Sequence, residues 1–199
     1  MFDLKVFKLL LIVFSVLALQ SCSQQDKFTN VDISGSKSFS PAFELQDHLG
    51  KVRYLEDFKG KVLVVFFGYT QCPDVCPSTM FEMKKVMELL DKDADQVQVA
   101  FITLDPDRDT LELLEKYVPS FDARFLGLRP QSPEALEKVV KGYKIFYQKV
   151  SGKDPKYYTI DHTAGSFAID KKGQLRLFIR HNQGEKNLAD DLKKLVRAN

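Results

Sequence analysis

Residues 61–77 have the sequence KVLVVFFGYTQCPDVCP, in which an apolar run leads directly into a loop with two cysteines. The run from residue 62 to residue 68 is continuous and rich in β-branched side chains, which is typical of a strand buried on both faces of a sheet. Over residues 80–90, apolar side chains then recur at the spacing of one helical face. The sequence therefore predicts a central strand, a cysteine-bearing loop and a helix in direct succession.

Strands and helices alternate on both sides of this stretch. Apolar or alternating segments predict strands, and helical periodicity behind an N-cap residue predicts helices. The expected strands are at 43–46, 52–54, 97–104, 125–128, 166–170 and 175–179, and the further helices are at 110–118, 133–142 and 188–195. Residues 147–158 are expected to form a hairpin or an irregular insertion. This order predicts an α/β sandwich with a mixed central sheet, an N-terminal hairpin and flanking helices.

Composition limits the classes of protein to which the chain can belong. Hydrophobic residues make up 44% of the 199 residues, which excludes disordered and collagen-like chains. This length suits a single domain that is large enough to bury a core. Lys and Arg total 29 against 27 Asp and Glu, a net charge of +2. This near-neutral balance predicts no nucleic-acid partner, and we expect a monomer.

Residues 1–21 are predicted to be a lipoprotein signal peptide. Two lysines precede an apolar run of eleven residues at 9–19, which suits a secretory signal and is too short to span a bilayer. The sequence LQSC at 19–22 resembles the bacterial lipoprotein cleavage box, in which the cysteine becomes the lipidated first residue of the mature protein. Cys22 is therefore the predicted lipid anchor. The alternative is a plain signal peptide or membrane anchor with an incidental cysteine.

These signals predict a location at the cell membrane. Residues 22–40 are polar and without periodicity, so we expect a flexible tether between the membrane and a folded domain at 41–199. A lipoprotein of this kind faces the periplasm or another extracytoplasmic space, where pairs of cysteines can oxidise.

Cys72 and Cys76 are the two cysteines that remain once Cys22 is assigned to the anchor. They stand four residues apart across a predicted helix start, so their Cβ atoms are about 5–6 Å apart and a disulfide needs only a small adjustment. The positive end of the helix favours thiolates, and a pair of thiolates is both a redox couple and a clamp for a soft metal. The alternative is a structural disulfide or two buried thiols. Asp74, between the two, is interpreted as a helix cap.

A third group near the cysteines would favour metal binding. His162 precedes the predicted strand at 166–170. If that strand lies beside the central strand, the histidine approaches the cysteine loop, where Asp161 could orient its ring. His48 is expected to be exposed in a hairpin turn and His181 to lie in a polar loop, both without a role in the site.

Residues 105–110 have the sequence DPDRDT and follow the second buried strand. Asp109 or Thr110 is predicted to cap the next helix, and Arg108 is interpreted as a surface residue. For Asp105 and Asp107, a position at the rim of the site or a role in docking a partner is weighed equally with no role.

Three motifs occur together in this chain. They are FGYT at 67–70 leading to CPDVCP at 72–77, DPDRDT at 105–110, and DHT at 161–163. In this combination the chain resembles the Sco/SenC family of thioredoxin-fold copper proteins, over nearly the whole domain from residue 43 to the last helix. The C-x-x-x-C spacing separates it from ordinary thioredoxins, which have C-x-x-C. The resemblance implies a thioredoxin-like sandwich.

The resemblance also implies a function and its residues. Cys72, Cys76 and His162 would bind a copper ion. The partner would be the copper-bearing subunit of cytochrome c oxidase, to whose binuclear centre the protein would deliver copper. The same resemblance allows a second role, in which Cys72 and Cys76 cycle through a redox-active disulfide and keep the cysteines of the oxidase reduced.

The chemistry of these residue types agrees with copper. Two thiolates and one imidazole suit Cu(I) and leave coordination open for transfer, whereas structural zinc would need a fourth ligand. Met80, Met83 and Met87 are predicted to pack in the core rather than to act as thioether ligands. Three alternatives stay open: a metal-free thiol-disulfide oxidoreductase, a thiol peroxidase, because the early hairpin also resembles peroxiredoxins, and a copper sensor or store.

Overall fold

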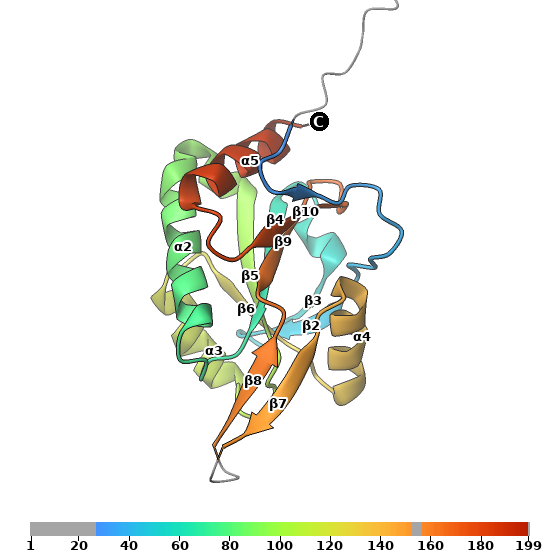
Figure 1. The fold of residues 1–199 in the computed structure, drawn as a ribbon, viewed down its shortest axis with the longest axis vertical. Helices are drawn as coiled ribbons and strands as arrows, with labels where there is room; N and C mark the ends of the chain where they lie inside the picture. Colours follow the sequence, from blue (N-terminus) through green and yellow to red (C-terminus); the bar gives the residue numbers. More distant parts are fainter. Residues whose placement is uncertain (1–26, 153–156, 199) are drawn as a thin grey trace, which may run out of the picture.

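The apolar run of the sequence forms β4 (Val62–Gly68), a fully buried strand in the middle of a large sheet (Figure 1). The computed structural model describes residues 27–152 and 157–198. The strands of the large sheet are ordered β1-β10-β9-β4-β5-β6-β2-β3. β4, β5 and β6 run parallel to one another, and the other neighbours pair in antiparallel. The predicted mixed central sheet is confirmed.

Apart from β1, β7 and β8, the other elements follow the order that the sequence predicts. The strands are β1 (Val31–Asp32), β2 (Glu44–Asp47), β3 (Val52–Tyr54), β5 (Val97–Thr103), β6 (Leu126–Arg129), β7 (Tyr147–Ser151), β8 (Tyr158–His162), β9 (Gly165–Ile169) and β10 (Leu175–Arg180). The α-helices are α2 (Val75–Leu90), α3 (Leu111–Tyr117), α4 (Pro133–Tyr143) and α5 (Glu185–Arg197), and short 3-10 helices span Leu55–Phe58, Asp91–Gln96 and Val118–Ser120.

The helices cover both faces of the sheet. Successive side chains of a strand point to opposite faces, so Val64 and Phe66 pack in one core with α2 and α5, and Val65 and Phe67 pack in a second core with α4. Figure 1 shows α2 and α5 on one side of the sheet and α4 on the other. A strand that is apolar at every position is the pattern that this sandwich requires.

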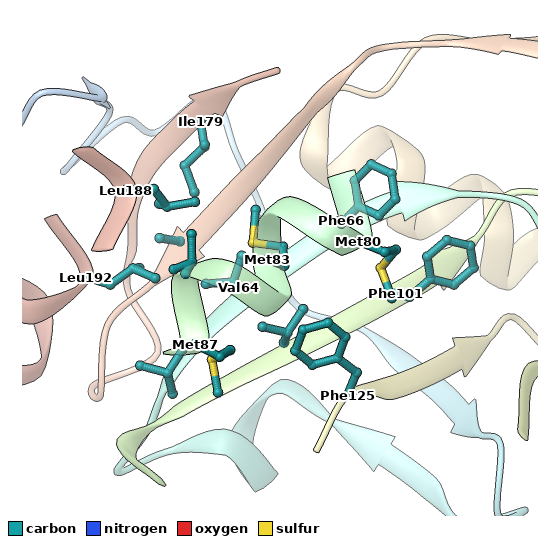
Figure 2. Close-up of a cluster of buried hydrophobic side chains, with 14 of the residues drawn as sticks. Val64, Phe66, Met80, Met83, Met87, Phe101, Phe125, Ile179, Leu188 and Leu192 are labelled. Atoms are coloured by element: carbon teal, nitrogen blue, oxygen red, sulfur yellow. The ribbon is translucent and has the colours of Figure 1, made fainter. Parts of the chain in front are cut away.

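The methionines of α2 belong to the first of these cores. Met80, Met83 and Met87 are almost completely buried, and Figure 2 shows them pointing from the helix toward the sheet. Their flexible side chains fill the space between the helix and the aromatic rings of Phe66 and Phe101. The prediction that they pack in the core is confirmed.

The segment at 147–158, expected as a hairpin or an irregular insertion, is a hairpin. Its strands β7 and β8 pair in antiparallel from Tyr147–His162 to Ser151–Tyr158. They form a two-stranded sheet separate from the large one. In Figure 1 this hairpin extends from one end of the molecule, so His162 lies at the root of the hairpin and not in a loop.

Part of the expected tether is instead docked on the domain. The main-chain N–H groups of Thr29 and Asn30 donate to the buried carboxylate of Asp191 in α5 at 2.9 and 2.8 Å. β1 then pairs with β10, where Val31 lies opposite Phe178. A strand of two residues is too short to show periodicity, and the segment is held both by a buried acid and by apolar side chains that pack against the two cores. Residues 29–32 are therefore docked on the domain, ahead of the boundary predicted at residue 41.

The predicted signal peptide and Cys22 lie outside the described residues. Among the residues that are described, no helix is long and apolar enough to cross a membrane.

Candidate metal and redox site

The two cysteines lie where β4 passes into α2. Cys72 is half-buried in the connecting loop, and Cys76 is fully buried in the first turn of the helix. The main-chain N–H of Cys76 points at the sulfur of Cys72 at 3.5 Å. The helix begins at Val75, inside the motif, which places the Cys72 sulfur at the positive helix end.

Gly68 makes room for Cys76, a role that sequence reasoning missed. A Cβ atom on Gly68 would lie 2.8 Å from the Cys76 sulfur and 3.0 Å from the ring of Phe101. Even the smallest side chain at the end of β4 would therefore displace the buried thiol. The signal was available in the sequence, because a glycine that ends an apolar strand often marks a close approach of another group.

His162 faces the buried cysteine. Its Nε2 lies 3.8 Å from the sulfur of Cys76, and its Nδ1 lies 3.1 Å from the carbonyl oxygen of Thr163. A carbonyl oxygen only accepts, so Nδ1 carries a proton and donates to it; in the neutral ring this leaves the lone pair on Nε2, the nitrogen that faces the sulfur. The ring of Tyr69 meets the imidazole edge to face. The carbonyl of Thr163, and not Asp161, thus orients His162.

The pairing of β9 with β4 explains this approach. Residues 166–169 of β9 lie beside residues 63–66 of β4, and His162 precedes β9 by only three residues. The strand after His162 therefore lies beside the central strand, which was the condition for the histidine to approach the cysteine loop.

The two thiols differ sharply in acidity. A hydrogen bond from the thiol of Cys76, together with main-chain N–H groups of Asp74 and Cys76, lowers the pKa of Cys72 from 9.0 to about 5. The hydrogen bond to Cys72 and then burial raise the pKa of Cys76 above its ordinary value of 9.0. The pair therefore holds one thiolate, on the accessible sulfur, and one thiol, on the buried sulfur.

An open hollow of about 350 Å³ lies in front of these groups. Its walls come from the cysteine loop and from the end of β8, and they include Tyr69, Cys72, Ile160 and His162. A partner or a small ligand can therefore reach Cys72 and the histidine from solvent, while Cys76 lies behind them.

The spacing of Cys76 and His162 suits a shared metal ion. A metal about 2.3 Å from a thiolate sulfur and about 2.0 Å from an imidazole nitrogen, as zinc is, holds these atoms roughly 3.7 Å apart at an angle of about 120°. The observed separation is 3.8 Å. Within 27–152 and 157–198, however, no three His, Cys, Asp or Glu side chains already form a finished metal site. Binding by all three groups therefore requires a small movement of Cys72 or His162.

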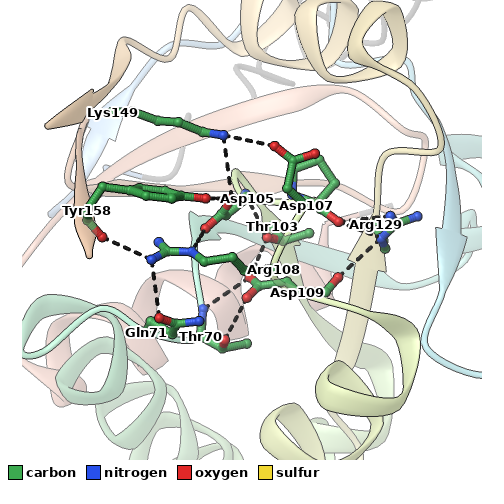
Figure 3. Close-up of polar contacts among 11 residues, drawn as sticks. Thr70, Gln71, Thr103, Asp105, Asp107, Arg108, Asp109, Arg129, Lys149 and Tyr158 are labelled. Atoms are coloured by element: carbon green, nitrogen blue, oxygen red, sulfur yellow. Dashed lines mark hydrogen bonds and ion pairs between the residues drawn. The ribbon is translucent and has the colours of Figure 1, made fainter. Parts of the chain in front are cut away.

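The motif at 105–110 borders this site, because β4 and β5 are parallel and both end at this edge (Figure 3). Arg108 is not a surface residue: its guanidinium pairs with the fully buried carboxylate of Asp105. Asp109 is not the helix cap: it accepts hydrogen bonds from the hydroxyls of Thr70 and Thr103. Thr110 is the cap of α3, since its side chain accepts from the N–H of Leu113.

Three other side chains differ in part from expectation. His48 is buried, not exposed, and its Nδ1 accepts a hydrogen bond from the N–H of Gly127; burial lowers its pKa. His181 lies after β10, with Nδ1 3.2 Å from the hydroxyl of Thr79. Asp74 occupies the N-cap position of α2, but its side chain makes no capping hydrogen bond. His48 and His181 do not enter the cysteine site, whereas Asp74 lines the hollow in front of Cys72, and its main-chain N–H helps to lower the pKa of Cys72.

The fold and the site together define a thioredoxin-like dithiol protein with a histidine facing the dithiol. The chain belongs to the SCO1/SenC family, whose model matches residues 31–197. The resemblance stated from the motifs is confirmed.

Known relatives support this assignment. A SCO2-like protein of Rickettsia felis is 32% identical over 165 residues, which cover 82% of this chain and 77% of the relative. ScoI of Bradyrhizobium japonicum, solved with copper bound, is 38% identical, with a TM-score of 0.73 over 79% of this chain and 99% of its own. BsSco is described as a member of the Sco family of cytochrome c oxidase assembly proteins with a disulfide switch. It is 20% identical, over 88% of this chain and all of its own, with a TM-score of 0.66. At this identity the likeness shows the fold alone.

Proposed function

We propose that this protein is a membrane-anchored, extracytoplasmic copper chaperone for assembly of the binuclear copper centre of cytochrome c oxidase. Cys72, Cys76 and His162 bind the copper that it carries. Membership of the SCO1/SenC family and the likeness to copper-bound ScoI support the metal, and Cys22 is the proposed lipid anchor.

One observation supports the ligand set above all. The Nε2 atom of His162 faces the Cys76 sulfur at 3.8 Å, although 86 residues separate them in the chain. The hydrogen bond from Nδ1 to the carbonyl of Thr163 is the kind of second contact that fixes a metal-binding imidazole. Two soft sulfurs and one imidazole suit Cu(I) and leave a coordination position for the receiving protein.

The test is a titration of the full chain, in detergent, with Cu(I) in competition with a chelator. We expect the reduced protein to bind about one copper per chain. Protein with a Cys72–Cys76 disulfide should not bind, because metal binding requires thiolates. Equal binding by both forms would place the ligands elsewhere. Transfer of the copper to the apo copper-bearing domain of the oxidase then tests the chaperone role.

A second candidate function, thiol-disulfide reduction of the oxidase cysteines, is favoured by the unequal thiols. The Cys72 thiolate would attack a substrate disulfide and release one substrate thiolate. Cys76 would give its proton to the released thiolate and then attack the Cys72 sulfur of the mixed disulfide, which releases the second substrate thiolate. The substrate gains two electrons and the Cys72–Cys76 pair loses two. The pKa of Cys72, lowered to about 5, and its position in front of the buried Cys76 suit this order of attack.

His162→Ala separates the two functions. A dithiol reductase needs its two cysteines, so disulfide exchange should remain close to wild type. A chaperone loses its third ligand, so Cu(I) affinity should fall while the thermal melt of the metal-free protein stays near wild type. An unchanged affinity in a folded His162→Ala protein would exclude His162 as a ligand and favour the reductase.

A further inference from the structure

The hairpin that carries His162 is not held by the main sheet. Among the described strands, β7 and β8 pair only with each other, and the link from His162 to β9 is two residues long. Backbone hydrogen bonds of the large sheet therefore do not fix the angle of the hairpin over the cysteine loop. Side chains must do so, and the motif at 105–110 supplies several of them (Figure 3).

Arg108 contacts the hairpin and the cysteine loop at once. Its Nη1 donates to the carbonyl oxygen of Tyr158 at 3.0 Å and to the side-chain oxygen of Gln71 at 3.2 Å. Its guanidinium also stacks on the ring of Tyr158, 3.6 Å from the centroid. One largely buried cation thus joins β8 to the residue before Cys72.

Asp105 completes this contact by pairing with the Nε edge of the guanidinium. Its side chain has no exposed surface, and it accepts from the hydroxyl of Tyr158 at 2.8 Å as well as from Arg108. Lys149 of β7 donates to Asp107 at 2.9 Å, so the second strand of the hairpin is tied to the same loop. The negative charges of Asp105 and Asp107 are matched by the positive charges of Arg108 and Lys149. This pairing offsets the cost of removing the charges from water.

The loop at 105–110 also binds the cysteine loop, through Asp109. Asp109 accepts from the N–H of Thr70 at 3.1 Å and from its hydroxyl at 2.6 Å. Residues 105–109 therefore hold the cysteine loop on one side and the β7–β8 hairpin on the other. This loop therefore contributes to the relative position of Cys76 and His162, together with Ile160 of β8, which is buried in the core beside α2.

We propose that Arg108, Asp105 and Tyr158, named here the hairpin latch, are positioning residues that keep His162 in reach of the cysteines and so set the affinity for copper. This inference rests on the proposed function, in which His162 is the third ligand. Loss of the Tyr158 hydroxyl leaves the contacts of the cysteine loop in place and lets the hairpin, with its imidazole, move away from the sulfurs.

Tyr158→Phe is the mildest test, because it removes one hydroxyl and keeps the ring on which Arg108 stacks. We expect the Cu(I) affinity of the reduced full chain, measured by chelator competition, to fall about 10-fold, and Arg108→Met to cost roughly 10- to 100-fold, the usual range for residues that support metal ligands. Tyr157→Phe is the matched control, one residue away and 73% exposed. Arg124→Met, which breaks only an ion pair with Asp122, is the second control. Neither control should change the affinity.

Double variants show whether the effect passes through His162. In a His162→Ala background, Tyr158→Phe should cause no further loss, whereas a merely structural role would give the same loss in both backgrounds. X-ray absorption of the copper-loaded Tyr158→Phe protein should show a weakened nitrogen contribution with two sulfurs retained. A thermal melt of each metal-free variant checks the fold.

The outcomes distinguish failure of the hairpin latch from failure of the proposed ligand set. If His162→Ala weakens copper binding but folded Tyr158→Phe and Arg108→Met proteins bind as wild type, the latch is wrong and the ligand set stands. Additive losses in the double variant also overturn the latch. If His162→Ala itself binds copper as tightly as wild type, the proposed ligand set fails, and the latch fails with it.

Discussion

The thiolate of this site belongs to Cys72, because hydrogen bonds at the start of α2 stabilise the charge on the accessible sulfur. In the folded protein the first proton leaves near pH 5, and in the unfolded chain near the ordinary value of 9.0. The depressed pKa therefore favours the folded state as pH rises through this interval, and that contribution is lost as pH falls through about 5. The pair titrates as a unit, since the second proton stays on Cys76.

The first prediction is a pH profile of alkylation. Iodoacetamide should modify Cys72 of the reduced protein at a rate that is half-maximal near pH 5 and level by pH 7. Cys76 should react far more slowly, because it is buried and protonated. Peptide mapping after a timed pulse measures both rates. Equal labelling of the two cysteines at pH 7 would contradict the assignment.

The second prediction concerns Gly68. In Gly68→Ala the new Cβ would stand 2.8 Å from the sulfur of Cys76, so we expect a loss of about 1–3 kcal/mol of stability, the usual cost of overpacking a core. Cu(I) affinity should fall as well, because the sulfur must move. Thermal and urea unfolding of the metal-free protein measure the cost. In a Cys76→Ala background, Gly68→Ala should lower the stability by less. An equal loss of stability in both backgrounds would show that the new Cβ clashes with the rings of Phe66 and Phe101 rather than with the sulfur.

At the scale of elements, the site is assembled by loops that meet at one edge of a parallel pair of strands. The cysteine loop follows β4, and the motif at 105–110 follows β5. The two strands are parallel, so their carboxyl ends lie at the same edge of the sheet. The hairpin β7–β8 then brings His162 from a distant part of the chain. No single element carries the whole site, because the cysteines and the histidine come from separate parts of the chain.

The third prediction tests how the N-terminal segment is attached. Although burial works to raise it, hydrogen bonds from Asn30, Lys194 and Thr29 lower the pKa of Asp191 below 3.8. Asp191→Ala leaves those donors without a partner, and we expect a loss of about 2–4 kcal/mol at pH 7. The wild-type contribution is complete above pH 3.8 and fades as pH falls through the lowered pKa. Asp190→Ala, on the exposed face of α5, is the control.

Unfolding in urea and hydrogen exchange measure this attachment together. In Asp191→Ala the amides of β1 should lose protection against exchange, while β4 and β5 keep theirs. A stability equal to that of Asp190→Ala would show that the carboxylate is not what holds residues 29–30.

At the scale of the whole molecule, the sequence was sufficient for the sandwich and for the approach of His162 to the cysteine loop. That Cys72, Cys76 and His162 bind copper stays a prediction. The run at 62–68 is rich in β-branched residues, which favours a buried strand, and the spacing of apolar residues in α2 placed the methionines in the core. The sequence failed where a residue's role depends on contact across the fold. His48, Arg108 and Asp109 are polar residues beside turns, and only their distant partners, Gly127, Tyr158 and Thr70, make them buried.

The arrangement of the chain also bears on how the proposed anchor presents the site. In Figure 1 the described chain begins beside α5, at the end of the molecule opposite the β7–β8 hairpin. A lipid on Cys22 would therefore hold the domain by the end remote from the cysteine site. The hollow in front of Cys72 would face away from the lipid surface, where a membrane-bound partner's soluble domain can reach it.

The last prediction tests that anchor. Only the thiol of Cys22 can accept a diacylglycerol, so Cys22→Ser should abolish lipidation and leave the protein unprocessed or no longer attached by a lipid. Ser23→Ala, the matched control one residue away, should keep the lipid. Mass spectrometry of the mature N-terminal peptide and fractionation of cell membranes measure the two results. Because residue 22 precedes the described fold, the purified Cys22→Ser domain should still bind Cu(I) with wild-type affinity, so reduced oxidase activity in the cell would report misplacement and not a damaged site. Wild-type protein recovered lipid-free, or Cys22→Ser protein that still carries a lipid, would refute the anchor.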